Sequence, residues 1–171
     1  DNHYSAYHET DPNGLGGGME LDFAIEKVQE WSKAFKHATV CIGNHDRLIG
    51  RRAFSSNIPK AWIKSYNEVL GTSWDWQPRF VIDGVQYVHG EGGTARTRVK
   101  NDMISCVQGH IHTQCYVEHM CGQDKNIFAM QVGCGIDRES YSQAYARNYK
   151  KPAIACGVVI GGHTAINVMM D

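Results

Sequence analysis

Residues 38–46 read ATVCIGNHD, and this stretch decides the predicted fold. The run 38–42 is apolar or β-branched and stops at Gly43, which predicts a short buried strand. Polar side chains follow at once, at the carboxyl end of that strand, where α/β proteins gather their functional groups. The stretch therefore predicts an α/β fold with a functional loop at residues 43–46.

Histidines also follow two later predicted strands. RFVIDGVQYVHG (79–90) predicts a hairpin, because Asp-Gly favours a type I′ turn, and its second strand ends at His89. The run MISCVQ (103–108) predicts a strand that leads into GHIH (109–112). One such histidine alone favours a structural role with a satisfied hydrogen bond. Three strand-end segments favour a metal site, because imidazole and amide oxygens bind divalent ions and paired ions can hold both oxygens of a phosphoryl displacement.

Amphipathic periodicity predicts the helices. Residues 19–35 carry an apolar stripe at helical spacing that is expected to be core. The stripe consists of Leu21, Ile25, Val28, Trp31 and Phe35. A second helix is predicted from Ile58 to Leu70, with Pro59 near its start and Gly71 at its end. Its core face consists of Ile58, Trp62, Tyr66 and Leu70.

The second half of the chain is rich in strands. A short basic helix is predicted over 94–102 and a tyrosine-rich helix around 139–147. Further strands are predicted over 114–118, 126–132, 155–160 and 165–169. Helices alternate with strands in the first half of the sequence and strands dominate the second half, which predicts sheets covered by helices in a layered α/β sandwich. The length predicts a single domain over 1–171.

Composition limits the partners. The formal net charge of −1 encodes no general attraction to nucleic acid, so a nucleic-acid substrate would need a local basic patch. Two segments could supply one, although a solvated surface is the more frequent role of such charges. They are Arg47, Arg51, Arg52, Lys60 and Lys64, and Arg96, Arg98 and Lys100. No apolar run reaches membrane-spanning length and no leader is visible, so we expect no membrane contact and a cytoplasmic location.

The six cysteines show no C-x-x-C spacing, and four of them lie in predicted strands. We therefore expect reduced cysteines packed in the core. A zinc site formed by Cys115, His119 and Cys121 is the alternative, but its spacing fits no zinc-ribbon pattern.

GNHD (43–46), a strand-end histidine with glycine (89–90), and GHIH (109–112) resemble the later motifs of the calcineurin-like metallophosphoesterase superfamily. The opening DNHYSAYHETDP, GNHDRL and KSYNEVLG (64–71) are similar to its phage and prophage-type members. The resemblance extends from residue 1 to about 136. It implies an α-β-β-α sandwich that hydrolyses phosphate esters with two divalent ions, for which Mn, Fe, Zn, Co and Ni are all suitable.

The resemblance also implies residue roles. The implied ligands are Asn44, His89 and His110 for one ion and His112 for the other. His45 would protonate the leaving oxygen or steady the phosphate, and Asp46 would orient it. Arg47 would either approach the phosphate or have an ordinary surface or ion-pair role.

The family also has an earlier D-x-H motif and a G-D-x-x-D/N motif, whose aspartates neutralise and bridge the ions. No Gly-Asp pair precedes Gly43. Asp1-Asn2-His3 is therefore interpreted as the tail of the second motif, with Asp1 and His3 as accessory residues, or else as the D-x-H motif itself. On the first interpretation the first strands lie upstream, and we expect open sheet edges, self-association and poor metal retention.

The implied reaction is attack on phosphorus by a metal-bound hydroxide. A phosphodiester is the expected substrate, with nucleic acid as one candidate and small nucleotides or phosphoproteins as others. Trp74 and Trp76 are candidates for base stacking, because the helical spacing of Trp62 and Tyr66 predicts core positions for them. The rival hypotheses are an inactive scaffold for a protein partner and a nucleic-acid-binding module without hydrolysis.

Overall fold

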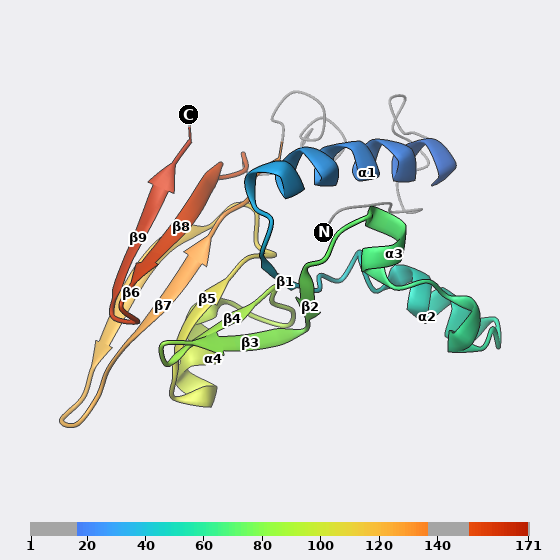
Figure 1. Cartoon of the computed structure of the whole chain (residues 1–171). Coiled ribbons are helices and arrows are strands. Elements are labelled where there is room, and N and C mark those ends of the chain that lie inside the picture. The colour runs from blue at the N-terminus through green and yellow to red at the C-terminus, as the bar shows by residue number, and fades with distance from the viewer. Residues whose placement is uncertain (1–16, 137–150, 171) are drawn as a thin grey trace. The chain divides into compact units, whose positions relative to one another are not determined.

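The computed structural model describes residues 17–136 and 151–170 (Figure 1). Its contacts divide the chain into two compact units, 1–78 and 79–171. Whether these units form the single domain expected from the length is not tested by this division, so the single domain stays a prediction. Helices and sheets are mixed, which confirms the α/β class. No helix within the described parts is long and apolar enough to cross a membrane. Asp1, His3 and the helix predicted around 139–147 lie outside the described residues.

The first unit combines helices with one pair of parallel strands. Its elements are α1 (Gly17–Ala34), β1 (Thr39–Cys41), α2 (Leu48–Ser55), the 3₁₀ helix η1 (Lys60–Trp62), α3 (Tyr66–Leu70) and β2 (Asp75–Gln77). Strand β1 confirms the predicted strand before Gly43, and it pairs in parallel with β2. Val28 of α1, Leu70 of α3 and Trp74 form the buried core that joins these elements.

The continuous helix predicted over 58–70 is wrong. Ser65 has an extended backbone and forms a capping box with Glu68, so a new helix, α3, begins there, and it ends at Gly71 in the left-handed conformation. Trp62 lies before this break and is 82% exposed, whereas Leu70 is buried as predicted. Helical spacing alone could not show that a cap interrupts the segment.

Two further expectations for aromatic residues are corrected. Trp74 is only 8% exposed, and its indole Nε1 donates a hydrogen bond to the carbonyl of Phe35 at 2.8 Å, so it is a core residue and not a stacking platform. At the end of the α1 stripe, Trp31 and Phe35 are exposed, although they stack on each other with ring centroids 5.7 Å apart. Only the middle of that stripe is buried.

The second unit is built on a five-stranded sheet. Its elements are β3 (Arg79–Ile82), β4 (Val85–Val88), α4 (Ala95–Asp102), β5 (Ser105–Gln108), β6 (Cys115–Cys121), β7 (Asn126–Val132), β8 (Ala155–Ile160) and β9 (Thr164–Met169). The sheet order is β3-β4-β5-β7-β6, and β8 and β9 form a separate antiparallel pair. The β3–β4 hairpin confirms the predicted Asp-Gly turn, since Asp83 and Gly84 both have positive φ.

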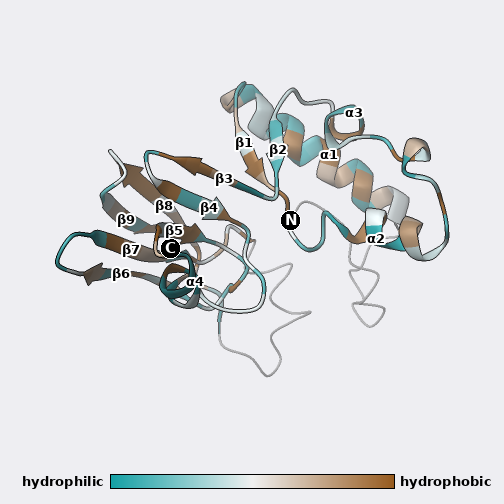
Figure 2. Ribbon diagram, turned by 90° about the horizontal axis from the view of Figure 1, so that it is seen from below, coloured by the Kyte–Doolittle hydropathy of each residue, from teal (hydrophilic) through white to brown (hydrophobic). Residues whose placement is uncertain are grey.

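The sheet is covered differently on its two faces. Side chains of β7 alternate between the faces, so Ala129 packs with Val99 of α4, while Phe128 and Met130 pack toward Val159 of β8. Helix α4 therefore covers one face, and the β8–β9 hairpin covers the other. In Figure 2 most of α4 is hydrophilic, whereas β3 is largely hydrophobic.

The expectation that the cysteines are core residues is correct for Cys106 and wrong for Cys121 and Cys156, which are exposed. No disulfide joins the six cysteines, all of which lie in the described parts of the chain. Burial raises the pKa of the Cys41 thiol to about 11. Of the two exposed cysteines, Cys156 lies in a predicted strand and Cys121 lies beyond the predicted strand 114–118, so a predicted strand did not guarantee burial.

At pH 8 we expect iodoacetamide to alkylate Cys121 and Cys156 well before Cys41. A pKa of about 11 leaves roughly one Cys41 thiol in a thousand ionised at that pH, and the thiolate is the nucleophile. The thiolate fraction, and with it the Cys41 rate, rises about tenfold per pH unit until the pKa is reached. Mass spectrometry of the time course measures this, and equal rates for Cys41 and Cys156 would contradict the assigned burial.

Candidate functional site

The second unit brings two of the predicted histidines together. Strands β4 and β5 are parallel neighbours with Val88 opposite Gln108, so the residues after them emerge at the same sheet edge. His89 Nε2 and His110 Nδ1 lie 3.1 Å apart, and the ring planes are inclined by 71°. This separation is a hydrogen-bonding distance, so one ring nitrogen donates to the other, and the tautomers decide which is the donor.

The backbone at this edge is shaped for that approach. His110 has a φ of 65°, in the left-handed region that few non-glycine residues adopt. Gly90 has a φ of 98°, and a Cβ there would lie 2.5 Å from the Gln108 side chain. At both residues the backbone therefore turns away from the direction of the preceding strand.

Buried glutamines fix the loops that carry the histidines. Gln108 Nε2 donates to the carbonyl of Gly93 at 2.7 Å, which holds the loop after His89. Gln131 Nε2 donates to the carbonyl of Gly109, and its Oε1 accepts from the Ala95 backbone N–H at 3.2 Å. Sequence reasoning missed these residues. The available signal was a glutamine inside otherwise apolar strands, because a buried amide needs partners.

His112 is held through its backbone. Its carbonyl accepts a hydrogen bond from the Ala153 N–H at 2.8 Å, and the Cys134 thiol lies 3.9 Å from the same oxygen. Burial raises the pKa of the Cys134 thiol, which favours the neutral, structural form. His112 itself is half-buried. The GHIH segment is therefore tied to the strand region around residue 153 as well as to β7.

In the first unit, the GNHD segment forms a turn between β1 and α2. Asp46 is 2% exposed, and its Oδ2 accepts from the Gly43 N–H at 2.7 Å. The Tyr66 hydroxyl donates to the Asp46 carbonyl at 2.9 Å, and burial, together with the Asp46 charge, raises the pKa of that hydroxyl. The Leu48 N–H donates to the His45 carbonyl at 3.0 Å. These contacts fix the backbone that carries Asn44 and His45.

The donor set of the second unit fits part of a metal site. Two imidazole nitrogens bound to one ion at about 2.0–2.1 Å stand roughly 2.9–3.4 Å apart, depending on geometry. The 3.1 Å between His89 Nε2 and His110 Nδ1 agrees with that spacing. Among the described residues no group of three or more His, Cys, Asp or Glu side chains could hold an ion. The histidine pair therefore brings two ring nitrogens to one place at the sheet edge.

The alternative zinc site does not fit. Cys115, His119 and Cys121 lie on the single strand β6. Six residues of extended chain separate the two cysteines by roughly 20 Å at about 3.3 Å per residue, far beyond the reach of one ion.

No family model, curated protein or solved structure matches this chain. The metallophosphoesterase resemblance therefore stays a prediction from the motifs.

Proposed function

We propose that this protein is a metal-dependent phosphoesterase that hydrolyses a phosphodiester with a dinuclear metal centre, on the α-β-β-α sandwich of the calcineurin-like superfamily. The observation that carries the proposal is the approach of His89 and His110 to 3.1 Å at the ends of adjacent parallel strands. Two imidazoles from separate loops are within hydrogen-bonding distance of each other, and buried amides fix the loops that carry them, which is how outer partners orient the ligands of a metal site.

In this proposal His89 and His110 hold one ion, and His112 belongs to the other. A divalent ion supplies charge to polarise the phosphoryl oxygen and to lower the pKa of a water molecule. The protein contributes the remaining parts. By the resemblance, Asn44 is a further ligand, and His45 donates a proton to the leaving oxygen. Asp46 acts by holding the turn, since its carboxylate accepts from the Gly43 N–H.

The test is a titration of the full chain with Mn²⁺, read by calorimetry, together with hydrolysis of bis(p-nitrophenyl) phosphate. We expect His110→Ala to weaken Mn²⁺ binding by at least about tenfold and to remove chelator-sensitive hydrolysis, because it deletes a ligand. His163→Ala is the matched control, since His163 is an exposed histidine of the same unit. Equal Mn²⁺ affinity in the wild type and His110→Ala would exclude the proposed ligand role.

A further inference from the structure

One segment of the first unit is strongly basic. Residues 47–67 contain five cationic residues and no Asp or Glu, although the whole chain has a net charge of −1. The cations are Arg47, Arg51, Arg52, Lys60 and Lys64. All but Arg47 are exposed. The segment therefore presents four exposed cationic side chains and contributes no acidic side chain.

The same segment exposes two aromatic rings. Phe54 at the end of α2 is 85% exposed, and Trp62 at the end of η1 is 82% exposed. Exposed aromatic rings offer flat apolar faces on which unpaired bases can stack. The exposure of Trp62 was not predicted, because the helical spacing assigned it to the core, and no environment was predicted for Phe54.

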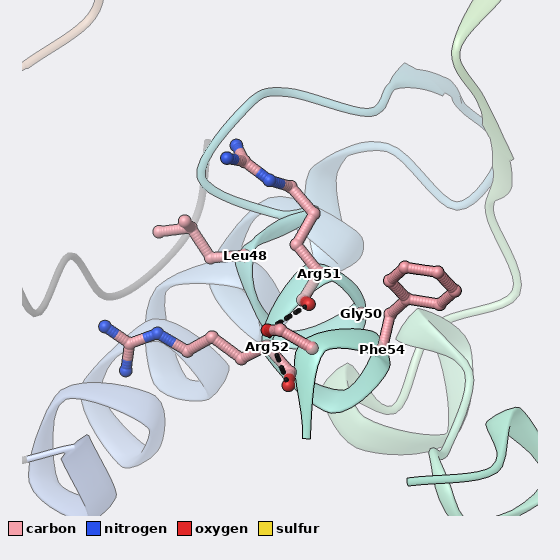
Figure 3. Close-up of a pocket in the computed structure, with 6 residues that line it drawn as sticks. Leu48, Gly50, Arg51, Arg52 and Phe54 are labelled. Atoms are coloured by element: carbon pink, nitrogen blue, oxygen red, sulfur yellow. Dashed lines mark hydrogen bonds between the residues drawn. The ribbon is translucent and has the colours of Figure 1, made fainter. Parts of the chain in front are cut away.

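Helix α2 also borders a hollow of about 500 Å³. Its lining residues are Leu48, Gly50, Arg51, Arg52, Phe54 and Ser55. The Ser55 hydroxyl donates to the carbonyls of Arg51 and Arg52 at 2.9 and 3.1 Å, which ties it to the helix backbone (Figure 3). The two guanidinium groups extend away from the helix in Figure 3. Cations and an aromatic ring thus border one hollow.

We infer that this α2–η1 surface, made of Arg51, Arg52, Phe54, Lys60, Trp62 and Lys64, binds single-stranded nucleic acid. Arginine and lysine neutralise the phosphates, and unpaired bases stack on Phe54 and Trp62. A free phosphate would not require the aromatic rings, and an apolar protein partner would not require the cations. The proposed binding does not require phosphodiester hydrolysis. The further step, that the bound strand is also the substrate, rests on the proposed function.

The experiment measures fluorescence anisotropy of labelled 20-nucleotide oligo(dT) and oligo(U) with the full chain in EDTA, which prevents hydrolysis. We expect Phe54→Leu and Trp62→Leu each to weaken binding on the order of tenfold, because leucine keeps the apolar bulk and loses the π face. The double variant Arg51→Ala/Arg52→Ala should lower the slope of log affinity against log salt by about 1.4, at about 0.7 per phosphate contact on a single strand.

Matched controls lie elsewhere in the chain. Trp31→Leu removes an exposed tryptophan from α1, and Lys125→Ala/Lys151→Ala removes the same charge from the second unit. Neither should change the affinity or the salt slope by more than about twofold. If these controls weaken binding as much as the α2–η1 variants, the binding surface lies elsewhere and the inference is overturned.

Other outcomes separate the two proposals. The inference is overturned if no oligonucleotide binds. It is also overturned if the aromatic variants leave the affinity unchanged and inorganic polyphosphate displaces the oligonucleotide from wild type and variants equally well. Hydrolysis of the small diester in that case leaves the proposed function intact. Oligonucleotide binding through the α2–η1 surface without any metal-dependent hydrolysis supports the inference and contradicts the proposed function.

Discussion

Replacing His45 by alanine is expected to lower phosphodiester turnover about 10²- to 10⁴-fold while leaving Mn²⁺ binding unchanged. A positioned proton donor to the leaving oxygen contributes a factor of that size. The substitution preserves the turn, because the hydrogen bond from Leu48 is accepted by the His45 backbone carbonyl. The measurement is kcat for bis(p-nitrophenyl) phosphate at saturating Mn²⁺, with the metal affinity from calorimetry.

His37→Ala is the control for this variant, since His37 is an exposed histidine of the same unit. It should retain wild-type turnover. A trace activity that His45→Ala leaves unchanged would mean that hydrolysis occurs at another site or in a contaminant. Oligonucleotide binding that persists in His45→Ala while turnover is lost would distinguish an enzyme from a nucleic-acid-binding module or a scaffold.

The strand ends were predictable because their signals are local. An apolar run that stops at Gly43, and an Asp-Gly pair between two β-rich runs, depend only on neighbouring residues. The structure has β1 and the β3–β4 hairpin at those places. Parallel pairing of β4 with β5 then brings His89 to His110. The sequence could not predict which strands pair, because strand pairing joins residues that are far apart in the chain.

The helices after the GNHD turn were harder to predict, because periodicity does not report burial. Helix α2 has only 8 residues and contains Gly50, so its apolar pattern was too short to be recognised as a helix. Trp62 is exposed and Trp74 is buried, the reverse of what was expected, because a new helix begins at the Ser65 cap after Trp62 and Trp74 packs with Val28 and Leu70. The buried glutamines were missed for a related reason: an amide in a strand reveals its partners only when distant loops are in place.

Replacing Gln131 by glutamate is expected to destabilise the second unit by about 3 kcal/mol at pH 7, the order of cost for a buried charge without an opposite charge beside it. Gln131 is 0% exposed, and its Nε2 donates to the Gly109 carbonyl. An ionised carboxylate at this position would present an oxygen to that carbonyl, whereas a protonated carboxyl could donate to it. The measurements are urea unfolding followed by circular dichroism and hydrogen exchange of the Ala95 amide.

The sign of the pH dependence tests this account. Burial raises the folded-state pKa of the new carboxyl above its unfolded value of about 4.3, so the folded state binds more protons in the interval between them. The free energy of unfolding of Gln131→Glu should therefore fall, relative to the wild type, as the pH rises above about 4.3.

Two variants are the controls. Gln131→Met should lower the free energy of unfolding by the same amount at every pH, because it removes the side-chain amide that bonds the Gly109 carbonyl and the Ala95 N–H and adds no titratable group. Gln123→Glu adds the same charge at an exposed position and should change stability by less than about 0.5 kcal/mol. A Gln131→Glu protein as stable as Gln123→Glu at pH 7 would show that the amide does not hold the loop that carries His110.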